Sequence, residues 1–393
     1  MIEPRMRLSG VLALLFVLAA CAAPPTIPSG EPCSAIAFTV TDDFDGARRG
    51  DCQVVGDNRV VLHIRPEDQP PINDSPWFSF RIAPNTATTA EIVLRYSGGH
   101  HRYIPKVSFD GEQWEPLDES SVEEKRRGRM ATIRLPLTAE SVYVSAQELK
   151  LPHHVNQWTR RMAEETPASM FVLGESAQGR PIYVLDVSTE QRDVLMITGR
   201  QHPPEVSGSF AFEAFAETVF GDSDLATRFR ERFRIVAIPL MNPDGVVAGN
   251  WRHNTGGVDL NRDWGPFTQP ETRLAGRLLQ TMEASGQKVR AFLDFHSTSR
   301  NVFYTQNDEF PTDPLGFTET WLNNAAQRIT DYEFDNSQNP VSDQANGKNF
   351  MYRRYGIPAV TYEVGDETDR GAAQSAARIF AEELMKLMLE QEY

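Results

Sequence analysis

Four near-continuous apolar runs in the second half of the chain limit its fold more than any other feature. They span residues 194–198, 233–240, 289–295 and 359–364. Such runs are typical of strands buried on both faces, in a sheet with helices on each side. Helical patterns lie between them, over residues 208–220, 269–284 and 318–329, and a last one follows over residues 372–389. We therefore expect residues 151–393 to form an α/β domain with a parallel or mixed sheet flanked by helices.

The preceding part of the chain, residues 33–150, has a different pattern. Short runs rich in β-branched and aromatic residues alternate with turn residues, at 60–64, 77–82, 90–96, 106–109 and 131–135. Their spacing and the lack of helical periodicity predict a smaller antiparallel β-sandwich domain. Neighbouring histidines such as His153 and His154 would point to opposite faces of a strand, so we do not expect them to share a metal.

The first residues predict export and a lipid anchor. A short basic start precedes an apolar run at 11–20, which is too short to span a membrane. The sequence Leu18-Ala19-Ala20-Cys21 resembles a bacterial lipobox. We expect residues 1–20 to be a lipoprotein signal peptide, Cys21 to carry lipid, and residues 21–32 to be a tether. In a bacterium with two membranes, Ala22 after the cysteine indicates the outer membrane, on its periplasmic side. The alternative is a plain secretory signal.

Cysteine content and charge give two further expectations. Besides Cys21, the chain has only Cys33 and Cys52, an even pair in an exported protein, which predicts either a disulfide or two buried thiols. The formal net charge of −15 makes a nucleic-acid partner a poor interpretation, because the phosphate backbone is also negative.

Candidate chemistry lies just after the predicted strands. Sites in open α/β sheets form at the carboxyl ends of the strands, so side chains that follow different strands meet there. His202 and Glu205 follow the first run, His296 follows the third, and Glu363 lies in the fourth. Two prolines between His202 and Glu205 indicate a tight turn rather than a helix face. Two histidines and one glutamate with an open fourth position are typical of catalytic zinc. We expect one zinc ion per chain.

Six separated motifs share their order with a known family. They are His202-x-x-Glu205, Asn242-Pro243-Asp244-Gly245, Trp251-Arg252, Gly257-Val258-Asp259-Leu260-Asn261-Arg262, His296-Ser297 and Thr361-Tyr362-Glu363. Over residues 155–393 the chain resembles the zinc metallocarboxypeptidases of the carboxypeptidase A type. The segments 43–46, 62–68 and 77–80 resemble the sandwich of the cytosolic carboxypeptidase subfamily, here in a bacterial lipoprotein form. The resemblance implies a mixed sheet of the eight-stranded, carboxypeptidase-like type behind a β-sandwich.

The resemblance also implies an activity and roles for named residues. The enzyme would hydrolyse the C-terminal peptide bond of peptides or proteins. Glu363 would act as general base and then general acid, and Arg252 would stabilise the developing oxyanion. Asn261 and Arg262 would bind the terminal carboxylate of the substrate.

Two positions bear on specificity. Lys348 falls where the family places the base of the pocket for the last side chain, and an ammonium there favours a C-terminal Glu or Asp. The family's loop tyrosine would fall near Val341, where this chain has none, and neither Tyr332 nor Tyr352 takes its place by position.

Two other functions remain open at this stage, and so does the oligomeric state. A murein peptide amidase would use the same chemistry on cell-wall peptides. A non-catalytic peptide-binding lipoprotein would use the cleft without reaction.

Overall fold

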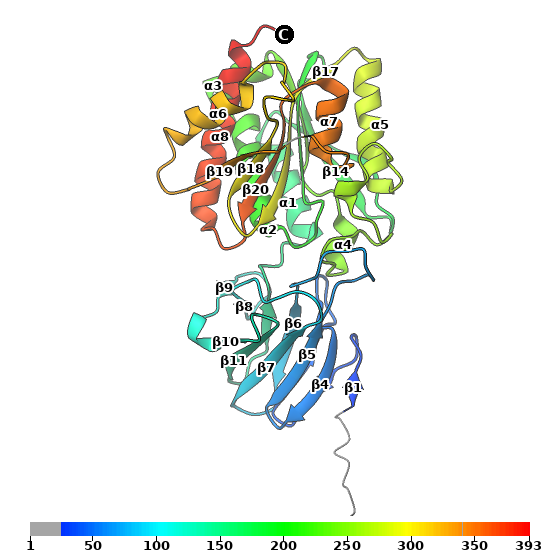
Figure 1. Cartoon of the computed structure of the whole chain (residues 1–393), viewed down its shortest axis with the longest axis vertical. Helices are drawn as coiled ribbons and strands as arrows, with labels where there is room; N and C mark the ends of the chain where they lie inside the picture. Colours follow the sequence, from blue (N-terminus) through cyan, green and yellow to red (C-terminus); the bar gives the residue numbers. More distant parts are fainter. Residues whose placement is uncertain (1–24, 340) are drawn as a thin grey trace, which may run out of the picture.

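The computed structural model describes residues 25–339 and 341–393, which form two domains stacked end to end (Figure 1). The predicted signal peptide, Cys21 and the first part of the predicted tether lie outside these residues. Within the described part of the chain, no helix combines the length and the apolar character that a membrane span requires.

The N-terminal domain is a sandwich of two six-stranded sheets. In spatial order the first contains β1 (Thr26–Ile27), β4 (Asp51–Gly56), β5 (Arg59–Ile64), β7 (Thr88–Tyr96), β11 (Met130–Leu137) and β10 (Val122–Lys125). The second contains β2 (Cys33–Ser34), β3 (Phe38–Thr41), β6 (Ser79–Pro84), β12 (Val142–Ser145), β8 (Lys106–Ser108) and β9 (Glu115–Pro116). A short 3-10 turn, η1 (Glu119–Ser121), precedes β10.

The sandwich follows from the alternating pattern of its strands. On β7, for example, Ala90, Ile92 and Leu94 all point into the core between the sheets. A disulfide joins Cys33 on β2 to Cys52 on β4 and so links the two sheets.

Two details of the sandwich differ from expectation. β5 and β7 pair in parallel, because the chain crosses to the other sheet as β6 between them. The sandwich also starts earlier than residue 33. β1 pairs with β4, so part of the segment predicted as a tether belongs to the sheet.

The C-terminal domain is built on one mixed sheet of eight strands, which confirms the predicted fold class. In spatial order the strands are β13 (Ser169–Glu175), β14 (Pro181–Val187), β16 (Phe233–Ile238), β15 (Asp193–Gly199), β17 (Lys288–Thr298), β20 (Ala359–Gly365), β18 (Val302–Thr305) and β19 (Asp335–Gln338). The four central strands β16, β15, β17 and β20 run parallel.

Helices cover both faces of this sheet (Figure 1). One face packs against α1 (Pro152–Glu165), α2 (Val206–Phe220), α3 (Asp224–Arg230), α6 (Phe317–Ala326) and α8 (Arg370–Glu390). The other face packs against α5 (Pro270–Ala284) and α7 (Gly347–Tyr355). Successive residues of β15 alternate between the two cores, with Leu195 in the first and Met196 in the second. This double burial explains the continuous apolar runs of the sequence.

The two domains meet beside the carboxyl ends of the parallel strands. The chain passes between them at residues 146–151, and α4 (Pro243–Val247) lies at the junction (Figure 1). Gly46 donates its backbone N–H to the carbonyl of Val247 at 2.8 Å, and Lys106 forms an ion pair with Glu367 at 2.6 Å. A second 3-10 turn, η2 (Leu260–Arg262), follows α4 in sequence.

Candidate active site

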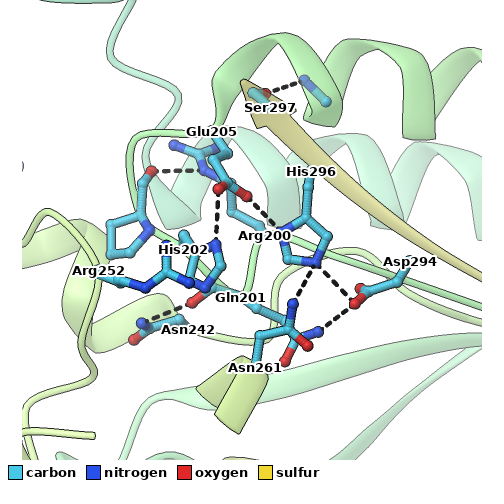
Figure 2. Close-up of polar contacts among 12 residues, drawn as sticks. Arg200, Gln201, His202, Glu205, Asn242, Arg252, Asn261, Asp294, His296 and Ser297 are labelled. Atoms are coloured by element: carbon cyan, nitrogen blue, oxygen red, sulfur yellow. Dashed lines mark hydrogen bonds and ion pairs between the residues drawn. The ribbon is translucent and has the colours of Figure 1, made fainter. Parts of the chain in front are cut away.

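The three predicted zinc ligands converge at the ends of β15 and β17. Glu205 lies between the two imidazoles, with Oε1 2.7 Å from Nδ1 of His202 and Oε2 2.7 Å from Nδ1 of His296 (Figure 2). One ligand atom from each residue lies within 4.8 Å of the others. Both histidines are buried, since His202 is 4% exposed and His296 is 1% exposed.

The turn that carries His202 and Glu205 is held by buried contacts. Arg200 adopts a left-handed backbone conformation with φ 57°, and its side chain donates to the carbonyl of Pro203 at 2.7 Å and to Ser209 at 3.1 Å. The first turn of α2 also packs closely on β17, because a Cβ on Gly208 would lie 2.4 Å from the carbonyl oxygen of His296. The position of the turn is therefore fixed by the sheet beside it.

The outward nitrogen of each histidine is bound by a carboxylate. Nε2 of His202 lies 3.0 Å from Oδ1 of Asp259, and Nε2 of His296 lies 2.8 Å from Oδ2 of Asp294. Arg252 donates from Nε to the other oxygen of Asp259 at 2.6 Å. Carboxylates in this position orient metal-binding histidines, and here they leave Nδ1 of each ring facing Glu205, the third predicted ligand.

The charges of these groups fit a divalent cation. Burial opposes charge on both imidazoles, but the carboxylates outweigh it and raise the pKa of His202 and of His296. Burial also opposes charge on Glu205, but the two imidazoles outweigh it and lower the pKa of that carboxyl. Arg252 offsets one carboxylate charge, and a cation between the rings would offset more. Two histidine nitrogens and a carboxylate are the donors that zinc takes in catalytic sites.

Glu363 lies beside the three ligands on the neighbouring strand β20. It is directly opposite His296 in the register of β17 and β20. Burial raises the pKa of Glu363 to about 7. Its Oε2 atom is buried and has no hydrogen-bond partner in the described part of the protein. A carboxylate with this environment is suited to exchange a proton near neutral pH.

Most of the predicted site residues line one cavity of about 330 Å³. They are His202, Glu205, Arg252, Asn261, Arg262, Lys348 and Glu363. Asn261 accepts from the backbone N–H of Gly347 at 3.0 Å, and Arg262 donates to the carbonyl of Asn261 at 2.7 Å.

Lys348, in the first turn of α7, is buried in the wall of this cavity. It is 5% exposed, and its Nζ has no hydrogen-bond partner among residues 25–339 and 341–393. Burial lowers the pKa of Lys348 to about 8.

Comparison with known proteins identifies the family of this domain. The family described as zinc carboxypeptidase matches residues 155–384, which is more than half of the chain. The chain belongs to the zinc carboxypeptidase family. This confirms the predicted resemblance, and the metal in the family's description agrees with the predicted cofactor and with the donor set of the site.

The sequence relatives include one of similar length and several much longer proteins. An uncharacterized protein of Zymomonas mobilis is 26% identical over 343 residues, which cover 82% of this chain and 86% of the relative. Cytosolic carboxypeptidase 2 of Danio rerio is 30% identical over 193 residues, and cytosolic carboxypeptidase 3 of Mus musculus is 31% identical over 294 residues. These matches cover 44% and 63% of this chain but only 26% and 28% of the relatives.

Solved structures share the fold over both domains. A metallo-carboxypeptidase from Burkholderia cenocepacia superposes with a TM-score of 0.72 at 20% identity and covers 88% of this chain and 97% of its own. A metallo-carboxypeptidase from Pseudomonas aeruginosa gives 0.71 at 21% identity and covers 89% and 99%. The latter was solved in complex with (2-guanidinoethylmercapto)succinic acid.

The structure adds cavity residues that the sequence did not indicate. Asn73, Arg102 and Tyr103 of the sandwich line the cavity of the zinc carboxypeptidase domain, and so does Tyr304 of β18. Asn73, Arg102 and Tyr103 lie outside the sandwich segments that carry the family resemblance, so only the fold shows that they reach the cavity. Of the two carboxylates that hold the histidines, Asp294 could have been noticed, because residues two apart on one strand share a face.

Tyr332 and Tyr352, which lie near the position of the family's loop tyrosine in the sequence, make other contacts. Tyr332 is buried in the core of the sheet and accepts a hydrogen bond from the hydroxyl of Tyr362 at 3.1 Å. Tyr352 donates to the carbonyl of Pro311 at 3.2 Å.

The expectation for His153 and His154 is wrong in its geometry. Both lie in the first turn of α1 rather than on a strand, because Pro152 starts the helix there, and their ring centroids are 3.8 Å apart. With Glu112 they form a second group that could hold a metal. However, the backbone N–H of Leu151 donates to Nδ1 of His154 at 3.0 Å, so Nε2 carries the hydrogen that points to Glu112 at 2.9 Å. These contacts stabilise the start of α1.

Proposed function

We propose that this protein is a zinc-dependent metallocarboxypeptidase that removes the last residue of peptides or proteins and prefers an acidic one. The observation that carries the proposal is the arrangement of side chains in and around one cavity. A two-histidine, one-glutamate ligand set lies beside a carboxyl with a pKa of about 7, and cationic side chains line the same cavity.

The side chains suit the steps of amide hydrolysis. Zinc held by His202, Glu205 and His296 would lower the pKa of water and polarise the scissile carbonyl. Glu363 takes a proton from the attacking water and then delivers it to the leaving amine. Arg252 is held through Nε by Asp259 and lines the cavity, so its other N–H groups would be available to stabilise the developing oxyanion.

The C-terminal carboxylate of the substrate is the second group to be bound. Asn261 and Arg262 line the same cavity, and a guanidinium binds a carboxylate with two parallel hydrogen bonds. Binding a free carboxylate next to the scissile bond restricts cleavage to the end of a chain. Exopeptidase activity follows from that restriction.

The preference for an acidic last residue rests on Lys348. A buried ammonium without a partner is unfavourable, because burial removes its hydration. A glutamate or aspartate side chain of the substrate would supply the missing hydrogen-bonded counter-charge. The cavity also contains Arg102, Arg252 and Arg262, although the whole chain carries a formal net charge of −15.

A Glu363→Gln variant tests this activity. We expect it to bind zinc like the wild type and to lose hydrolysis of blocked dipeptides, whereas Glu333→Gln, on the surface of the same domain, keeps full activity. The peptide panel includes a cell-wall stem peptide. Cleavage of that peptide alone would favour the murein amidase, and no cleavage of any peptide by a zinc-loaded wild type would favour the non-catalytic binding lipoprotein.

We also infer a cellular location from the N-terminal sequence. The lipobox-like residues 18–21 and the two cysteines that remain for a disulfide support export followed by lipid anchoring at Cys21. The expected location is the outer membrane of a two-membrane bacterium, on its periplasmic side. Replacing Cys21 with Ser should move the protein from the membrane fraction to the soluble fraction. A wild type that is already soluble and without lipid would contradict the anchor.

A further inference from the structure

A carboxylate of the sandwich binds the loop that carries Arg252. Glu67 lies in the loop between β5 and β6 and is half-buried. Its Oε2 accepts from the backbone N–H of Trp251 at 2.9 Å. Its Oε1 accepts from the backbone N–H groups of Arg252 at 2.8 Å and His253 at 2.6 Å. One side chain of the N-terminal domain thus binds three successive amides of the catalytic domain.

Neighbouring contacts fix the same loop to the sandwich. Oδ2 of Asp68 lies 2.6 Å from Nδ1 of His253. Trp251 is 8% exposed and packs as part of the hydrophobic core of the sandwich. Residues 251–253 lie between α4 and η2, so no regular element of the catalytic domain contains them.

The loop in turn connects to a zinc ligand. Arg252 binds Asp259 at 2.6 Å, and Asp259 lies 3.0 Å from Nε2 of His202. A continuous set of hydrogen bonds therefore runs from Glu67 through the loop backbone and Arg252 to the histidine. Removing the Glu67 carboxylate would leave three amides without their acceptor, and the loop would lose a contact that holds the backbone from which the Arg252 side chain extends.

We propose that Glu67 is a positioning residue for Arg252, and that the β-sandwich therefore forms part of the catalytic machinery. The inference rests on the proposed function, because it concerns the residue assigned there to the oxyanion. It gives the sandwich a role that its own sequence does not reveal.

A double-mutant cycle in the full-length protein tests the proposal. A small displacement of a catalytic group can cost about 100-fold in rate. We expect Glu67→Ala to lower kcat about 10-fold to 100-fold and to change KM less than about threefold. In an Arg252→Ala background the same substitution should change kcat less than about threefold, because the group that Glu67 positions is already absent. Glu67→Gln keeps one acceptor oxygen and should give an intermediate loss.

Lys106→Met is the matched control. It also removes a contact between the domains, the ion pair with Glu367, but it does not touch the loop of Arg252. We expect its kcat to stay near that of the wild type. An equal loss for Glu67→Ala in both backgrounds, or an equal loss for Lys106→Met, would overturn the proposal, since either result indicates a general structural effect. If Glu67→Ala does not fold, Glu67→Gln replaces it in the cycle.

Zinc affinity provides a readout that does not need activity. Glu67→Ala should weaken zinc binding several-fold through Arg252, Asp259 and His202, and it should have no such effect in the Arg252→Ala background. A wild type that cleaves no peptide would contradict the proposed function. The zinc affinities of the same four proteins would then decide whether Glu67 positions Arg252. In that case, identical zinc affinity of Glu67→Ala and the wild type would overturn the positioning role of Glu67.

Discussion

Replacing Lys348 with Met should change which C-terminal residue the enzyme prefers. Met has nearly the same length and volume as Lys but carries no charge, so the buried wall of the cavity keeps its packing. Lys348 is 5% exposed, and its Nζ has no hydrogen-bond partner in the described residues, so a substrate carboxylate would be the group that pairs with it. The variant should therefore lose affinity mainly for substrates that end in Glu or Asp.

The expected magnitude follows from the burial of this pair. Removing one partner of a buried, hydrogen-bonded charge pair costs about 2–5 kcal/mol. At about 3 kcal/mol, kcat/KM for a substrate ending in Glu falls roughly 150-fold, since 1.4 kcal/mol corresponds to a factor of ten. A substrate ending in Leu gains no ion pair in the wild type, so its kcat/KM should change less than about threefold or rise.

The assay compares blocked dipeptides that differ only in the last residue, namely Glu, Asp, Gln, Leu, Phe and Arg. Lys386→Met, which removes a half-exposed lysine of α8, is the control and should leave the ranking unchanged. The reasoning is refuted if the wild type prefers Leu, Phe or Arg. It is also refuted if Lys348→Met keeps the ranking of the wild type.

Three further predictions concern the charge of Lys348, the contact between Asp259 and His202, and the disulfide of the sandwich. Burial lowers the pKa of Lys348 to about 8, and an amine is charged below its pKa. The kcat/KM for a substrate ending in Glu, divided by that for a substrate ending in Gln, should therefore be high below pH 8 and fall as the pH rises through 8. A ratio that stays constant between about pH 6 and 10 would contradict this. Asp259→Asn should weaken zinc binding about 10-fold to 100-fold in a competition with a chelating dye, because Asp259 orients His202, whereas wild-type affinity would show that the contact is dispensable. Replacing both Cys33 and Cys52 with Ala should lower the free energy of unfolding of the sandwich, measured in urea, by about 3 kcal/mol. The reason is that the disulfide joins residues 19 positions apart and so restricts the unfolded chain. An unchanged urea midpoint would contradict a stabilising disulfide.

The centre of the catalytic sheet could be predicted from the sequence, and its edges could not. β15, β17 and β20 are buried on both faces, and each contains a near-continuous apolar run. Runs of this kind are typical of such strands, so the sequence predicts them. The edge strand β19 has the sequence Asp-Asn-Ser-Gln and is mostly exposed, so it shows no strand pattern at all. β13 is also mostly exposed and was not predicted.

The same contrast holds for the site. Residues that follow parallel strands lie at the same edge of the sheet. His202, Glu205 and His296 could therefore be predicted to lie close together, because each follows a predicted strand. Contacts between the two domains have no comparable pattern in the sequence. Glu67 precedes Arg252 by 185 residues, and nothing in the local sequence of either residue indicates the other. The sandwich residues at the cavity therefore required the structure.

Removal and return of zinc test the central claim most directly. The wild-type protein is stripped of metal with a chelator and then titrated with zinc while the hydrolysis of a blocked dipeptide ending in Glu is followed. His202, Glu205 and His296 provide one site per chain, so activity should vanish in the stripped protein and return in full at about one zinc equivalent per chain. Full hydrolysis by the metal-free protein would contradict the account.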